Sequence, residues 1–99
     1  MGAENIAVFT VCDAVTGEII YIGAGNNIDR MYRELMNGYR IAKHGREYIK
    51  ECREKEALPK MRVLKWFPSR ETANSMRNKL IAHYKPMLNR YAKPLRERC

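Results

Sequence analysis

Apolar and polar residues near the beginning of the chain follow a pattern that is typical of strands. Residues 6–12 are rich in β-branched and aromatic side chains, and residues 18–23 form a second run of the same kind. The segment between them, residues 13–17, ends in a glycine and has the composition of a turn. Two short strands around a glycine-containing turn predict an antiparallel hairpin.

The spacing of apolar residues changes to a helical period after this hairpin. Residues 23–26 (Gly-Ala-Gly-Asn) are expected to form a loop whose glycines can take positive φ, and Asn26 or Asn27 can cap the next helix. The apolar positions of that helix are three or four residues apart: Ile28, Met31, Tyr32, Leu35 and Met36. Asn37-Gly38 is a typical helix end.

The second half of the chain predicts two more helices and one more strand. Residues 45–56 are charged and favour a partly exposed helix, and residues 61–67 alternate as a third strand. Ser69 can cap a helix that runs to residue 84 or 85, where Pro86 stops it. The apolar stripe expected on this last helix consists of Ala73, Met76, Leu80, Ile81 and Tyr84.

The predicted order of elements is β-β-α-α-β-α. This order indicates an α+β fold in which a small antiparallel three-stranded sheet is flanked by helices. The length of 99 residues suits one domain, residues 1–99, with its core at about residues 5–89 and a basic C-terminal tail at residues 90–99. Three cysteines, Cys12, Cys52 and Cys99, match neither a disulfide framework nor zinc-ligand spacing.

The net charge of +8 is concentrated in one part of the sequence. Residues 1–29 contain four acids and no Lys or Arg, so residues 30–99 hold all 19 bases against 7 acids, a net charge of +12. A surface of that sign attracts polyanions, and we expect a nucleic acid, DNA or RNA, as the partner. No apolar run reaches the roughly 20 residues that cross a bilayer, and no signal-peptide pattern is seen. We therefore expect a cytoplasmic protein with no membrane partner.

Several short motifs in this order resemble those of the GIY-YIG nuclease domain. Ala7-Val8-Phe9 stands where that family has Gly-Ile-Tyr, and Tyr21-Ile22-Gly23 matches the second half of its name. Asn27-Ile28 matches the entry into the first helix. The closing pattern of the family is matched by Leu80-Ile81, Tyr84, Pro86 and Asn89. The resemblance covers residues 5–89, and the closing asparagine is usually structural.

The resemblance implies a catalytic cleft with two tyrosines, an arginine, a histidine and a glutamate that binds one divalent metal ion. Of these five positions, only the second tyrosine, Tyr21, is kept. The other four fall on Phe9, Met31, Leu35 and Arg77. We interpret Phe9, Met31 and Leu35 as core residues, because Met31 and Leu35 belong to the apolar stripe of their helix while Arg30 lies off it.

Arg77 occupies the position at which the family places its metal-binding glutamate. A guanidinium has no lone pair for a cation and brings a fixed positive charge. We therefore expect no metal and no cofactor, with Mg²⁺ required only if the protein is an active nuclease. Arg77 itself has two interpretations: its stem reaches solvent or pairs with Glu18, or it points into the cleft and receives an anion beside Tyr21.

The candidate binding residues are Tyr21, the bases Arg30 and Arg77, and basic residues of the charged middle region. The latter are Arg40, Lys43, Arg46, Lys50, Arg53, Lys60 and Arg62. The leading hypothesis is a catalytically degenerate domain that binds nucleic acid through this basic surface and the former active-site cleft. The resemblance also favours a phage or mobile-element protein with a regulatory or anti-defence role.

Two alternatives remain open at this point. One is an active endonuclease with relocated catalytic residues. The other is a cleft that binds a protein partner or a small nucleotide. The oligomeric state is not indicated by the sequence.

Overall fold

The computed structural model describes residues 5–39 and 41–89, which form one sheet, three α-helices and a short 3₁₀ helix. The elements in chain order are β1 (Ile6–Cys12), β2 (Ile19–Gly25), α1 (Ile28–Met36), α2 (Lys43–Glu54), β3 (Lys60–Phe67), α3 (Arg70–Tyr84) and η1 (Met87–Asn89). The three strands form an antiparallel sheet in the order β2-β1-β3. The α+β class and the order of elements expected from the sequence are confirmed, and η1 is an addition.

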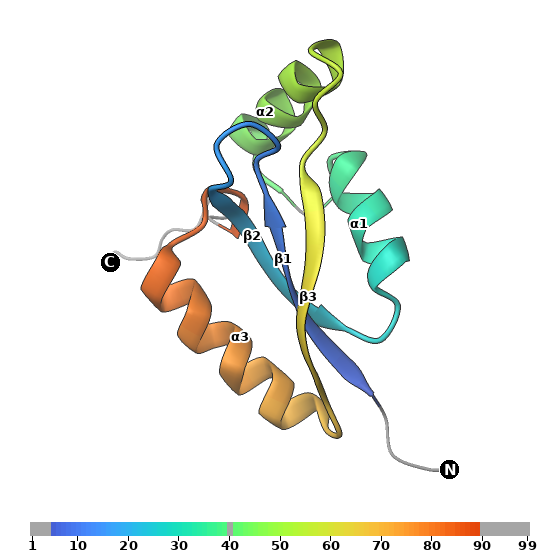
Figure 1. The fold of residues 1–99 in the computed structure, drawn as a ribbon, viewed down its shortest axis with the longest axis vertical. Coiled ribbons are helices and arrows are strands. Elements are labelled where there is room, and N and C mark those ends of the chain that lie inside the picture. The colour runs from blue at the N-terminus through green and yellow to red at the C-terminus, as the bar shows by residue number, and fades with distance from the viewer. Residues whose placement is uncertain (1–4, 40, 90–99) are drawn as a thin grey trace.

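The central strand, β1, separates two hydrophobic clusters. Phe9 and Val11 face one side of the sheet and pack with residues of α1, α2 and η1, whereas Ile6 and Val8 face the other side and pack with Ala73 of α3. Figure 1 shows α1 and α3 on opposite sides of the sheet, with α2 over one end. Because β1 is buried on both faces, its side chains are apolar at nearly every position.

The segment after the hairpin differs from the prediction. β2 continues past the predicted strand end at residue 23 to Gly25, and the glycines with positive φ in the described part of the chain are Gly17 and Gly38. Gly23 and Gly25 are required instead because neighbouring side chains leave no room for a Cβ at either position. A Cβ on Gly23 would lie 2.7 Å from Phe9 Cζ, and one on Gly25 would collide with the thioether of Met31.

The ends of the helices follow the predicted capping residues. The Asn27 side chain accepts a hydrogen bond from the backbone N–H of Arg30, and Ser69 accepts one from that of Thr72. The apolar stripe predicted for α3 is only partly correct. Ala73 is buried and Leu80 and Ile81 pack against its cluster, but Met76 and Tyr84 are exposed. No helix in residues 5–39 or 41–89 has the length and apolar character to cross a membrane.

Candidate functional site

A cleft lies along the outer edge of β2, between α1 and α3. We call it the edge cleft, and its volume is about 550 Å³. It is lined by Tyr21, Ile22, Gly23, Ala24, Met31, Arg70, Asn74, Arg77, Asn78, Ile81 and Asn89. Tyr21 and Arg77, which one of the two interpretations of Arg77 brings together, both line this cleft.

The β2 side of the edge cleft is formed by closely packed aromatic and sulfur-containing side chains. Phe9 is fully buried, and its ring centroid lies 6.1 Å from that of Tyr21. The Cα of Gly23 lies against both rings, since an added Cβ would be 2.9 Å from Tyr21 Cε2. Met31 reaches the cleft from α1 and packs over Gly25, while Leu35 is buried in the core. Phe9 and Leu35 are thus core residues as expected, and Met31 is half-buried between core and cleft.

The α3 side of the edge cleft presents hydrogen-bond donors. Arg70, Asn74, Arg77 and Ile81 lie four, three and four residues apart, so they share one face of the helix. Arg77 is half-buried, and its Nε and Nη2 donate to Asn78 Oδ1 at 3.2 and 3.0 Å. A guanidinium has five N–H donors, so those not used by Asn78 remain available in the cleft.

The alternative partner predicted for Arg77 is wrong. Within the described residues, the ion pair that forms is Arg30–Glu34 at 3.1 Å, and Arg77 contacts an amide rather than Glu18. Arg30 does not line the edge cleft. It lines an adjoining hollow of about 280 Å³ together with Glu34 and Arg70. Arg70 therefore belongs to both cavities, at the point where they meet.

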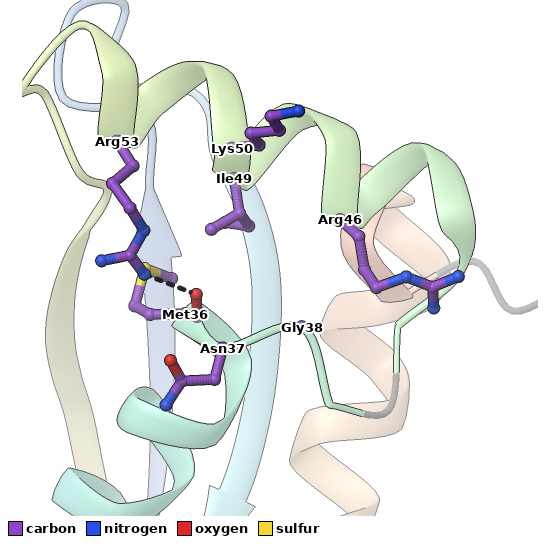
Figure 2. A pocket seen from close by; sticks show the side chains of 7 residues that line it. All are labelled: Met36, Asn37, Gly38, Arg46, Ile49, Lys50 and Arg53. Atoms are coloured by element: carbon purple, nitrogen blue, oxygen red, sulfur yellow. Dashed lines mark hydrogen bonds between the residues drawn. The ribbon is translucent and has the colours of Figure 1, made fainter.

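Three of the predicted basic residues line a second cavity, about 250 Å³ in volume, which we call the helix pocket (Figure 2). It lies between the C-terminus of α1 and one face of α2. Its lining consists of Met36, Asn37, Gly38, Arg46, Ile49, Lys50 and Arg53. The two arginines are held by backbone carbonyls, since Arg53 Nη2 donates to Met36 O at 2.8 Å and Arg46 Nη1 donates to Ile41 O at 2.9 Å.

The remaining predicted basic residues do not gather with these. Lys43 begins α2 and is exposed, but it lines neither cavity. Lys60 and Arg62 are exposed on β3, at the opposite edge of the sheet from the edge cleft. Arg40 lies outside the described residues, as does the basic tail of residues 90–99.

Arg70, Asn74 and Asn78 line the cleft but were not predicted from the sequence. The signal that would have found them is helical spacing from Arg77, because residues 70 and 74 lie two turns and one turn before it on the same face. The prediction for this helix considered only its apolar positions, so its polar face was not recognised.

The residues with resolved pKa shifts lie away from the edge cleft. The Tyr48 hydroxyl donates to Asp13 Oδ2 and, together with the backbone N–H groups of Thr16 and Val15, lowers the pKa of Asp13 from 3.8 to about 2. Burial and the hydrogen bond to Asp13 raise the pKa of Tyr48. This contact joins α2 to the hairpin turn and has a structural role.

Comparison with solved structures identifies the fold. The structure is similar to the GIY-YIG N-terminal endonuclease domain of UvrC from Thermotoga maritima, a point mutant bound to the catalytic divalent cation. The TM-score is 0.54, the sequence identity is 23%, and the match covers 91% of this chain and 88% of that domain. The chain therefore has a GIY-YIG-like fold. No protein-family model matches the sequence, and no curated protein is similar to it at a significant level.

The residues of the edge cleft do not fit a divalent cation. Its described lining contains amides and guanidiniums but no carboxylate, whereas Mg²⁺ and Mn²⁺ prefer carboxylate oxygens. Nowhere in residues 5–39 and 41–89 do three His, Cys, Asp or Glu side chains gather in a way that could hold a metal ion. Amides and guanidiniums are instead the groups that donate to phosphate oxygens.

Proposed function

We propose that this protein binds nucleic acid in its edge cleft and does not cleave it. The observation that supports this proposal is the composition of the cleft. Arg70 and Arg77 project from one face of α3 toward an edge strand that carries Tyr21, and no described carboxylate lines the space between them. A phosphate there would receive charge-assisted hydrogen bonds from both guanidiniums.

The position of Arg70 gives this proposal an electrostatic argument. Arg70 is the first residue of α3, where the helix macrodipole already contributes partial positive charge. A cation at that end is unfavourable in the isolated protein. A bound phosphate would offset the charge of Arg70 and the partial positive charge of the helix end. Ligand binding would therefore relieve an unfavourable arrangement in the free protein.

The partner is proposed to be a polyanion because the basic residues extend beyond the cleft. The helix pocket adds Arg46, Lys50 and Arg53 on the face of α2, and Arg30 lies in the hollow next to Arg70. Backbone phosphates repeat along a nucleic acid and can reach several such sites at once. A single small anion would fill only one of them.

A gel-shift titration with DNA and RNA oligonucleotides tests this proposal. Binding should be measurable at about 50 mM salt and should weaken steeply by about 200 mM, because each phosphate contact adds roughly 0.7 to 0.9 to the slope of log K against log salt. Arg70→Gln and Arg77→Gln should each weaken binding and flatten this slope. Lys79→Gln is the matched control, since Lys79 is exposed on α3 and does not line the edge cleft. Absence of binding at low salt would remove the proposal.

The same samples separate the alternatives. Cleavage of plasmid in the presence of Mg²⁺ or Mn²⁺, abolished by Tyr21→Phe, would show a nuclease instead. A ligand confined to the cleft, such as a nucleotide or a protein segment, predicts that Arg77→Glu abolishes binding while neutralising Arg46, Lys50 and Arg53 has little effect. The polyanion proposal predicts losses from both sets of substitutions.

A further inference from the structure

The helix pocket holds two exposed arginines, each already hydrogen-bonded to a backbone carbonyl before any ligand arrives. Figure 2 shows Arg46 and Arg53 reaching down from α2 at the two sides of the pocket, with Ile49 between them. Each guanidinium donates to a backbone carbonyl, and the stem of Arg46 packs on Gly38, whose added Cβ would lie 3.0 Å from Arg46 Cδ. Fixed guanidiniums lose little side-chain entropy on binding, and each still has N–H donors to offer.

The charges around the helix pocket favour an anion. Arg46, Lys50 and Arg53 lie at i, i+4 and i+7 on α2, so they form one positive stripe, and no described carboxylate lines the pocket. Each of these three bases is followed directly by an acid, so the acids lie about 100° further around the helix than the positive stripe. None of the three basic residues forms an ion pair within the described part of the chain. Their charge outweighs the partial negative charge of the α1 C-terminus.

An exposed aromatic residue stands beside this pocket. Gly38 has φ of +86°, and the backbone N–H groups of Gly38 and Tyr39 donate to Leu35 O and Glu34 O at 3.0 and 2.9 Å. This is the Schellman arrangement, which usually brings an apolar residue after the glycine back onto its helix. Here the residue three positions before the cap is Glu34, and Tyr39 remains 61% exposed.

Tyr39 connects the two cavities. It directly follows Gly38, which lines the helix pocket, and it lines a small hollow with Tyr21 and Met31 of the edge cleft. Glu34 and Leu35 complete the lining of this hollow. The backbone hydrogen bonds of the helix end fix where the Tyr39 side chain begins. An exposed ring whose backbone is held one residue after a cationic pocket is a combination that can bind a base and its phosphate.

We propose that Tyr39 and the helix pocket form a subsite for one unpaired nucleotide, so that the protein prefers single-stranded nucleic acid to duplex. The phosphate of this nucleotide lies between the guanidiniums of Arg46 and Arg53, and its base stacks on Tyr39. In a duplex both faces of each base are covered by its stacked neighbours, so Tyr39 can stack only on an unpaired base. This inference rests on the proposed function, because the strand continues into the edge cleft.

Binding of one oligonucleotide sequence as single strand and as duplex, followed by fluorescence anisotropy, tests the proposal. The single strand should bind more tightly. Tyr39→Ala should weaken single-strand binding roughly 5- to 150-fold, the effect of removing one stacked aromatic. Tyr39→Phe should bind like the wild type, because phenylalanine keeps the stacking face. Neither substitution should change the weaker duplex binding.

Two further measurements address the pocket and the contact itself. Lys50→Gln should weaken binding and reduce the salt slope by about 0.7, and Arg53→Lys should weaken it although the charge is kept, because the forked donor is lost. Photocrosslinking with a 5-bromouracil-containing single strand should modify Tyr39. Lys79→Gln again serves as the control.

The outcomes separate this inference from the proposed function. Equal affinity for single strand and duplex, or wild-type binding by Tyr39→Ala, would overturn the nucleotide subsite. If Arg70→Gln and Arg77→Gln still weakened binding, the proposed function would stand without it. Absence of binding to any oligonucleotide would overturn both.

Discussion

The side-chain amide of Asn89 pairs with both backbone polar groups of Ile22, as a neighbouring strand would. Ile22 N donates to Asn89 Oδ1 at 2.7 Å, and Asn89 Nδ2 donates to Ile22 O at 2.9 Å. Ile22 lies between Tyr21 and Gly23 on β2, an edge strand whose outer backbone groups have no strand partner among residues 5–39 and 41–89. A residue 67 positions away thus fixes the part of β2 that forms the edge cleft.

Asn89→Ala should destabilise the fold by about 1 to 3 kcal/mol, because it leaves two part-buried backbone groups without their partner. Asn89→Asp should also destabilise it, since an ionised carboxylate accepts from Ile22 N but cannot donate to Ile22 O. Urea unfolding followed by circular dichroism measures both effects. Asn26→Ala is the control, because Asn26 is exposed in the loop after β2. Equal stability of the Asn89→Ala and Asn26→Ala variants would contradict this account.

Gly23→Ala should cost about 1 to 3 kcal/mol through overpacking. The new Cβ would lie 2.7 Å from Phe9 Cζ and 2.9 Å from Tyr21 Cε2, and the buried Phe9 ring has little room to move. Gly25→Ala should cost less, because its Cβ meets the thioether of Met31, which is flexible and only half-buried.

A double-mutant cycle isolates the contact at Gly23. Phe9→Leu removes the ring that the new Cβ meets, so the combined variant should be more stable than the sum of the two single effects predicts. Thermal unfolding of the four proteins measures this coupling. Strict additivity would mean that Gly23 is required for another reason, such as the path of the strand.

The contact between Asp13 and Tyr48 should make stability depend on pH in the acid range. The pKa of Asp13 is about 2 in the folded protein, below its ordinary value of 3.8, so the folded state binds the proton less readily than the unfolded state. The stabilisation is therefore complete above about pH 4 and is lost as the pH falls toward 2. Tyr48→Phe should raise the pKa of Asp13 toward its ordinary value and weaken this dependence.

Carbon-13 NMR titration of the Asp13 carboxyl, together with urea unfolding between about pH 2 and pH 6, measures this effect. Val15 and Thr16 still donate through their backbone N–H groups in Tyr48→Phe, so part of the shift should remain. Tyr84→Phe is the matched control on an exposed tyrosine of α3. An unchanged Asp13 titration in Tyr48→Phe would show that the hydroxyl does not cause the shift.

The sequence predicted the elements whose pattern is local. The strand Ile6–Cys12 and the caps Asn27 and Ser69 follow from short-range composition, so their predicted positions agree with the structure. The glycines of residues 23–26 predict a loop with positive φ, because glycine is typical of turns. Their actual requirement is the close approach of Phe9 and Met31, which depends on packing between elements.

Only part of the candidate site could be predicted, because the rest also depends on packing between elements. Tyr21 and Arg77 were found from motif spacing, and both line the edge cleft. The contribution of Arg70 depends on how α3 is rotated against β2. Ala73, a small residue, is buried against the sheet, whereas Met76 is exposed. The apolar pattern of the sequence does not show which of these two residues faces the sheet.

The edge cleft of the wild-type protein should not bind divalent metal ions. Millimolar Mn²⁺ should not raise the melting temperature of the protein or broaden the NMR signals of Tyr21 and Gly23, because the described lining of the edge cleft offers no carboxylate and holds two guanidiniums. Arg77→Glu replaces one of these cations with a carboxylate and should introduce weak, saturable Mn²⁺ binding. Lys79→Glu makes the same charge change on an exposed residue outside the cleft and should not. Because a ligand that binds only the folded state stabilises it, the melting temperature reports binding, and the NMR signals report its place. Saturable Mn²⁺ binding by the wild type that broadens the signals of Tyr21 and Gly23 would contradict the proposal of a non-cleaving protein.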